Sequence, residues 1–210
     1  MTRRLGIPEL GKSQQRQERG IPMQGIVFAG DCGAHLATFP DPTPGPGEVI
    51  LEIKASGMCG SDLHVYRRPR GTISPEVIRG HEPSGVVVAV GPGTVGALAR
   101  VGARVMVHHY TGCASCPQCD SGWPHMCEEM PITVYGEDSH GAHAPFMKVR
   151  ADTLVPLDER LSFAAGAAIS CGVPTRPSGI FPRTVDLTFA SAKAGADMSV
   201  STQPGATQFT

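Results

Sequence analysis

Four cysteines follow one another closely in a stretch rich in turn-forming residues. The segment GCASCPQCDSGWPHMC covers residues 112–127 and spaces its cysteines as Cys-x2-Cys-x2-Cys-x7-Cys. Four thiolates complete the tetrahedral shell that zinc prefers, and short spacers let the backbone wrap around one ion. Such a shell leaves no position for water or substrate, so the zinc that it binds is structural rather than catalytic. The predicted ligands are Cys113, Cys116, Cys119 and Cys127.

Three other interpretations of this segment are weaker. Four cysteines also bind iron–sulfur clusters, but the spacing lacks the Cys-Pro pair that ends the bacterial ferredoxin motif. Buried cysteines without a metal are disfavoured because Pro117 and Pro124 indicate a loop rather than a core strand. A nucleic-acid-binding finger is disfavoured because Asp120 and Glu128 stand where phosphate contacts need Lys or Arg.

The composition narrows the classes of partner. The chain has 210 residues, of which 40% are hydrophobic, and 18 Lys and Arg against 19 Asp and Glu give a net charge of -1. This balance gives no electrostatic footprint for nucleic acid or a membrane surface. No apolar run approaches the roughly 20 residues of a membrane span, and residues 1–22 lack the apolar centre of a signal peptide. We expect a cytoplasmic protein whose cysteines stay reduced and free to bind metal.

Changes in patterning divide the chain into three parts. Residues 1–22 are polar and indicate a flexible N-terminal extension. In residues 23–172, short Val- and Ile-rich runs alternate with Gly/Pro turns, which predicts a β-barrel or sandwich; the runs are EVILEIKA, GVVVAV, ARVMVHH and HAPFMKVRA. Near the end of this part, LSFAAGAAIS predicts a helix with Ser162 as N-cap that ends close to Cys171. Residues 173–210 show no periodic pattern and are predicted to be an irregular tail.

A second group of potential metal ligands is spread along the chain. Taken singly, a cysteine is most often a core residue and a histidine most often a surface or hydrogen-bonded one. Together, one cysteine, a distant histidine and Cys171 would form a Cys2His shell with an open fourth position, as catalytic zinc requires. The residues concerned are Cys59, Ser61, Asp62 and His64 in GMCGSDLH, and His81 and Glu82 in GHEPSG.

Five ordered motifs resemble the N-terminal part of zinc-dependent medium-chain alcohol dehydrogenases. They are GPGEVILEIKASGMCGSDLHVY, GHEPSGVVVAVG, GCASCPQCDSGWPHMC, GAHAPFMKV and AAISCG, and the resemblance covers about Met23 to Gly172. It implies a mainly β fold, a GroES-like twisted β-barrel with short helices. It also implies a catalytic zinc on Cys59, His81 and Cys171, besides the structural zinc on the four cysteines of residues 113–127.

The resemblance also implies roles for the neighbouring residues. Glu82 would be a carboxylate near the zinc that exchanges with bound water, and Asp62 would orient the histidine ligand. Ser61 would pass the proton of the substrate hydroxyl to His64 and solvent. In this family zinc promotes alkoxide formation, and hydride passes to NAD(P). The version of the motif around Gly60 is as similar to polyol and threonine dehydrogenases as to simple alcohol dehydrogenases, so a small alcohol or polyol is the expected substrate.

The nicotinamide cofactor has no predicted site. The segment GPGTVG, residues 91–96, follows a strand but lacks the helix, second strand and acidic residue that complete a dinucleotide-binding fingerprint, so we predict a barrel turn. The family continues with a Rossmann domain, whereas residues 173–210 contain Pro174, Pro177 and Pro182 and are too few for that domain. We therefore expect an inactive or incomplete dehydrogenase fragment that is prone to form homo-oligomers. The alternative is a non-catalytic zinc-binding structural or interaction module.

Overall fold

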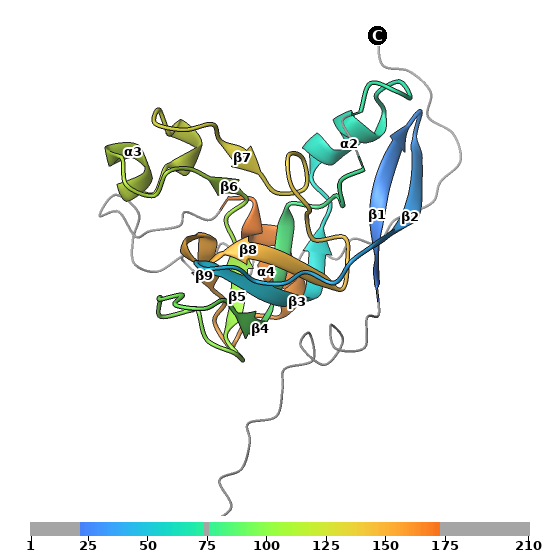
Figure 1. Ribbon diagram of the computed structural model, residues 1–210. Coiled ribbons are helices and arrows are strands. Elements are labelled where there is room, and N and C mark those ends of the chain that lie inside the picture. The colour runs from blue at the N-terminus through green and yellow to red at the C-terminus, as the bar shows by residue number, and fades with distance from the viewer. Residues whose placement is uncertain (1–21, 74–75, 173–210) are drawn as a thin grey trace, which may run out of the picture.

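The computed structural model describes residues 22–73 and 76–172, and these residues fold mainly into β-strands (Figure 1). The prediction of a mainly β fold with short helices is confirmed. The predicted tail and the predicted extension, apart from Pro22, lie outside the described residues. The strands are β1 (Met23–Gly30), β2 (Gly33–Phe39), β3 (Glu48–Gly57), β4 (Glu82–Val90), β5 (Arg104–Val107), β6 (Tyr110–Thr111), β7 (Thr133–Val134), β8 (Phe146–Arg150) and β9 (Leu154–Pro156). The helices are α2 (Gly60–Tyr66), α3 (Pro117–Asp120), α4 (Phe163–Ser170) and the short 3-10 turns η1 (Pro124–Met126) and η2 (Ala151–Thr153).

A five-stranded antiparallel sheet forms the centre of the fold. Its strand order is β8-β3-β4-β5-β9, and the hairpins β1-β2 and β6-β7 form two further small sheets. The β1-β2 hairpin lies beside α2 at the right of Figure 1, while α3, β6 and β7 lie at its upper left. The four-cysteine loop and helix α2 therefore lie at different ends of the molecule in this view.

The Val-Ile-Leu part of strand β3 is buried on both faces, which explains its three consecutive apolar residues. Val49 and Leu51 belong to one core cluster, together with Val87 and Val105. Ile50, between them, belongs to a second cluster on the other face, since successive side chains of a strand point to opposite sides. All three β3 side chains are fully buried, so this strand fixes the layers on both sides of the sheet.

The structure confirms most of the predicted strands. The runs EVILEIKA, GVVVAV, RVMV and FMKVR fall in β3, β4, β5 and β8. The GPGTVG segment lies in the connection between β4 and β5, where no helix follows the glycines, so the prediction of a turn is also confirmed. Strands β2, β6, β7 and β9 and helices α2 and α3 were not predicted.

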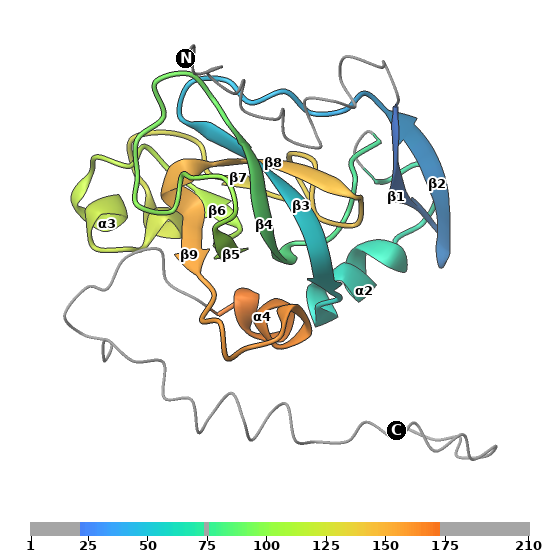
Figure 2. The same ribbon diagram turned by 90° about the horizontal axis from the view of Figure 1, so that it is seen from below.

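Helix α4 has the predicted position and N-cap. The Ser162 hydroxyl accepts a hydrogen bond from the Ala165 N–H at 3.1 Å, and Cys171 is the C-cap. The helix packs against β3 and β4 (Figure 2). Gly166 permits this close approach, because a Cβ there would lie 2.6 Å from the Ser84 hydroxyl and 3.0 Å from a Leu157 methyl group. The packing of α4 on the sheet thereby sets the position of Cys171.

Candidate metal centres

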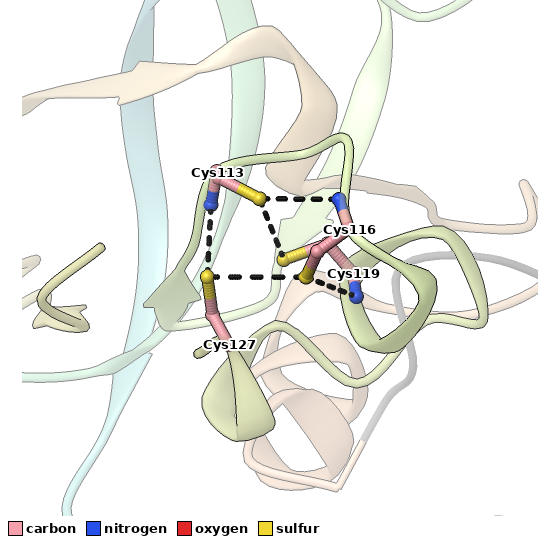
Figure 3. Close-up of side chains that lie close together, drawn as sticks. All are labelled: Cys113, Cys116, Cys119 and Cys127. Carbon is pink, nitrogen blue, oxygen red and sulfur yellow. Dashed lines mark hydrogen bonds between the residues drawn. The ribbon is translucent and has the colours of Figure 1, made fainter. Parts of the chain in front are cut away.

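The loop between β6 and β7 brings its four cysteine sulfurs into one cluster (Figure 3). All four Sγ atoms lie within 4.8 Å of one another. The Cys113 and Cys119 sulfurs are 3.9 Å apart, and those of Cys116 and Cys127 are 4.0 Å apart. Tetrahedral zinc with Zn–S bonds of about 2.3 Å requires sulfur separations of about 3.8 Å. The thiols are free rather than paired in disulfides, so the cluster fits a four-coordinate metal ion.

Backbone N–H groups of the loop point at these sulfurs. The Cys116 N–H donates to Cys113 Sγ at 3.2 Å, the Cys119 N–H to Cys116 Sγ at 3.4 Å, and the Cys113 N–H to Cys127 Sγ at 3.4 Å. Donors of this kind stabilise thiolates. Hydrogen bonds from Ser115 lower the pKa of Cys113 to about 6, whereas burial raises the pKa of Cys119 to about 12. The Cys113 N–H also lowers the pKa of Cys127, so the loop favours ionisation of Cys113 and Cys127, and a divalent cation would stabilise the Cys119 thiolate.

Gly112 lets the two ends of the loop meet. A Cβ at this position would lie 2.6 Å from Cys119 Sγ and 2.9 Å from the Cys127 Cβ. The Gly112 carbonyl accepts a hydrogen bond of 2.7 Å from the Arg150 guanidinium, which ties the loop to the end of β8. Any larger residue at position 112 would therefore displace the sulfur cluster.

A second cluster lies at the N-terminal ends of α2 and β4 and the C-terminal end of α4. The ligand atoms of Cys59, His81, Glu82 and Cys171 all lie within 4.8 Å of one another. Cys59 is the N-cap of α2, His81 and Glu82 stand at the start of β4, and Cys171 is the C-cap of α4. Two sulfurs, one imidazole nitrogen and a carboxylate are a donor set that zinc accepts. The structure thus brings together the ligands that the resemblance implied, with Glu82 beside them.

The register of the β3-β4 pair places Glu82 in this cluster. Gly57, the last residue of β3, pairs with Glu82, the first residue of β4. A Cβ on Gly57 would overlap the Glu82 carboxylate. Glycine at position 57 therefore leaves the space that this carboxylate occupies, two residues before Cys59.

Asp62 orients the histidine of the cluster. Its Oδ1 lies 3.3 Å from His81 Nδ1, and its Oδ2 accepts the Cys59 N–H at 2.8 Å. The carboxylate is buried, and its hydrogen bond raises the pKa of His81 to about 9. Because Nδ1 faces Asp62, Nε2 is the nitrogen directed at the cluster, and it lies 3.4 Å from the Ser61 hydroxyl. A carboxylate behind a histidine is a common arrangement at zinc sites, where it fixes the ring and raises its basicity.

The two cysteines of this cluster have different acidities. Hydrogen bonds from Ser61 are the main cause that lowers the pKa of Cys59. Burial, followed by the charge of Cys59, raises the pKa of Cys171 to about 12. Without a cation, one thiolate therefore opposes ionisation of the other, and a divalent ion between them would remove this repulsion.

Ser61 and His64 lie on the first and last turns of α2. Both side chains are exposed, and their spacing of three residues puts them on one face of the helix. Ser61 reaches the cluster through its contact with His81. Polar side chains of α2 therefore lie between the cluster and solvent.

A cavity of about 100 Å³ adjoins the second cluster. Of its lining residues, sequence reasoning assigned roles to Ser61, Asp62 and His81 but none to Arg79 and His109. His109 is buried, and burial lowers its pKa to about 3, so its ring is neutral; its centroid lies 4.9 Å from that of His81. The signal for Arg79 was its position two residues before the predicted ligand His81. The lining residues are Ser61, Asp62, Val65, Arg79, His81, His109, Tyr110, Val134, Gly136 and Glu137.

A known protein family matches the part of the chain that contains most of these candidate ligands. Residues 45–159 match the family model of the alcohol dehydrogenase GroES-like domain, and the chain belongs to this family. The GroES-like character of the fold and the zinc-type alcohol dehydrogenase relationship are thereby confirmed.

Individual relatives span a range of substrates. The chain is 40% identical over 166 residues to an uncharacterized zinc-type alcohol dehydrogenase-like protein, YphC, of Escherichia coli K12, covering 75% of this chain and 46% of that one. It is 39% identical over 127 residues to L-threonine 3-dehydrogenase of Pyrococcus furiosus, covering 59% and 35%. The structure of acetophenone reductase from Geotrichum candidum in complex with NAD superimposes with a TM-score of 0.62 at 32% identity, covering 71% and 44%. The chain thus spans less than half the length of these relatives.

Within residues 22–73 and 76–172, no helix is both long and apolar enough to cross a bilayer.

Proposed function

We propose that residues 23–172 form the metal- and alcohol-binding domain of a zinc-dependent dehydrogenase that acts on a small alcohol or polyol. The observation that carries this proposal is the convergence of Cys59, His81 and Cys171 beside a cavity. Three protein ligands leave one coordination position for a substrate oxygen, in contrast to the closed shell of the four-cysteine loop. The loop is proposed to hold the structural zinc.

The residues around the second cluster prepare it for this role. A zinc ion bound there supplies Lewis-acid chemistry that lowers the pKa of an alcohol hydroxyl. Asp62 holds the His81 ring so that Nε2 faces the metal position. Glu82, next to the ligands, is proposed to approach the metal when no substrate is present and to withdraw when one enters.

Ser61 and His64 are proposed to move the proton of the substrate hydroxyl. Ser61 stands at the cavity wall, close to the metal-facing nitrogen of His81. Its hydroxyl can accept a proton and donate its own, and His64 on the same exposed face of α2 can release that proton to water.

Hydride transfer needs NAD(P), and the described residues offer no cradle for its pyrophosphate. The GPGTVG glycines lie in the turn before β5, where no helix N-terminus faces them. We infer that this domain alone does not bind the nucleotide and does not turn over. A nucleotide-binding domain would have to complete the active centre.

The missing cradle also favours the second candidate function, a non-catalytic zinc-binding module. Such a module would use the four-cysteine loop to hold its fold and would have no need of an open metal site. The two functions therefore differ in whether an alcohol reaches a metal ion held by Cys59, His81 and Cys171.

Cobalt substitution distinguishes them. Cobalt(II) bound by thiolates absorbs visible light, so an alcohol that enters its coordination shell changes the spectrum. We expect propane-1,2-diol to change the spectrum of the cobalt-loaded 210-residue chain and to leave that of Cys171→Ala, which keeps only the loop metal, unchanged. Identical, alcohol-insensitive spectra for both proteins would favour the module. Calorimetric titration with NADH is expected to give no binding in either case.

A further inference from the structure

Arg79 is a buried arginine beside the proposed catalytic zinc site. Its residue exposure is 3%, and its side chain lines the same cavity as Ser61 and His81. An arginine is always charged at physiological pH, and burial of a charge without a partner is unfavourable. Its position therefore calls for a compensating group.

The protein provides hydrogen-bond acceptors for only some of the N–H groups of Arg79. Nη1 donates to the Gly136 carbonyl at 3.1 Å, and the plane lies 5.9 Å from the centre of the Phe28 ring. Nε is buried and has no hydrogen-bond partner. Among the described residues, no carboxylate forms an ion pair with it within 4.0 Å. The Nε donor is thus left without a hydrogen-bond acceptor from the described residues.

The remainder of the cavity is acidic. Asp62 and Glu137 line it, and Glu82 lies next to the ligand cluster. The charges of Glu137 and Asp62 attract the Arg79 guanidinium, but Asp62 is hydrogen-bonded to the Cys59 N–H and to His81, and neither carboxylate forms an ion pair with Arg79 within 4.0 Å. Arg79 is the only Lys or Arg among the residues that line this cavity. An anion entering the cavity would therefore meet the guanidinium of Arg79 on its wall.

We propose that Arg79 binds a carboxylate or phosphate group of the alcohol whose hydroxyl reaches the metal position. This inference rests on the proposed function and makes it more specific: the substrate is a small hydroxylated anion rather than a neutral alcohol. The planar guanidinium can donate two parallel hydrogen bonds to such a group. These bonds neutralise the anionic group and hold it in one orientation, which also orients the hydroxyl of the same molecule.

A series of three related ligands tests the proposal. Glycerol, glycerate and glycerol 3-phosphate share hydroxyl groups and differ in carrying no charge, a carboxylate or a phosphate. Ligand-observed NMR titrations of the zinc-loaded 210-residue chain should give a dissociation constant at least tenfold lower for one or both anions than for glycerol. The stronger of the two identifies the anionic group. Equal or tighter binding of glycerol would overturn the proposal.

Two substitutions separate recognition from a structural role. Arg79→Met keeps most of the side-chain length and removes the charge, so it should abolish the preference for the anion. Glu137→Gln, on the same cavity wall, should keep or increase that preference because it removes a repelling carboxylate. If Arg79→Met fails to fold, Arg79→Lys replaces it and should reduce the preference by losing the bidentate geometry. A preference that survives loss of the guanidinium would show that Arg79 only supports the fold.

Zinc content separates failure of this inference from failure of the proposed function. A protein that binds two zinc ions and shows an alcohol-dependent cobalt spectrum, but has no anion preference, contradicts only the role of Arg79. A protein whose second cluster binds no metal contradicts the proposed function itself.

Discussion

The two cysteine-containing clusters of this protein are built in opposite ways. The loop cluster takes all its ligands from residues 113–127 and depends on short turns, N–H donors and the close approach at Gly112. The second cluster takes Cys59, His81 and Cys171 from the ends of three elements that only the folded sheet brings together. Local spacing therefore determines the first cluster, and tertiary packing determines the second.

This difference has consequences for both stability and chemistry. A cluster with four sulfurs is closed and can contribute metal-binding free energy directly to folding. The second cluster is supported by Asp62 and bordered by a cavity, and we propose that it binds its metal through Cys59, His81 and Cys171 and keeps one position open. We expect substitutions to affect the two clusters separately, in the following order of magnitude.

The largest effect is expected from Cys119→Ser in the loop. This sulfur is buried among three others, and its loss leaves the metal with too few thiolates. Because structural zinc contributes on the order of 10 kcal/mol in small zinc domains, we expect the melting temperature to fall by more than about 10 °C in thermal unfolding monitored by circular dichroism. Cys32→Ser is the matched control, since Cys32 is exposed at the β1-β2 turn and belongs to neither cluster. A melting temperature equal to that of the control would refute a structural metal in the loop.

An intermediate effect is expected from Gly166→Ala in α4. The added Cβ would lie 2.6 Å from the Ser84 hydroxyl, so the helix must move away from β4 and carry Cys171 with it. Overpacking of this kind costs about 1–3 kcal/mol, and the affinity of the second cluster for zinc should fall while that of the loop is retained. Chelator competition measures both affinities, and Ala168→Ser, exposed on the same helix, is the control. Equal losses at the two clusters would contradict their independence.

A smaller effect, confined to one cluster, is expected from Asp62→Asn. The amide can still accept the Cys59 N–H, but it no longer supports His81 with a negative charge. Loss of such a supporting carboxylate lowers metal affinity by about 10- to 100-fold. Chelator competition should show this loss at the second cluster alone, and Glu137→Gln in the same cavity should leave affinity within about twofold. An unchanged affinity in Asp62→Asn would mean that the carboxylate serves only as a helix cap.

The sequence predicted those features that depend on local order. The four-cysteine spacing, the strands β3, β4, β5 and β8, and the Ser162 cap of α4 are each defined by a few adjacent residues, and the structure contains them. The joint position of Cys59, His81 and Cys171 came from resemblance to a family, because nothing in their spacing reveals the β3-β4 register or the packing of Gly166 that brings them together.

The sequence predicted less of the cavity wall. Helix α2 was missed because GSDLHVY is short, begins with glycine and contains the β-branched Val65, so its helical state depends on packing rather than propensity. Arg79 and His109 gain significance only from their burial beside His81, which residue type alone does not predict.

The zinc content of four proteins tests the central claim of two independent sites most directly. After dialysis against a weak chelator, we predict two zinc ions for the wild-type chain, one for Cys171→Ala, one for Cys119→Ser and none for the double variant. Elemental analysis normalised to protein concentration gives these numbers. Retention of two ions by Cys171→Ala, or a single ion in the wild-type chain, would contradict the existence of a second, open zinc site built from Cys59, His81 and Cys171.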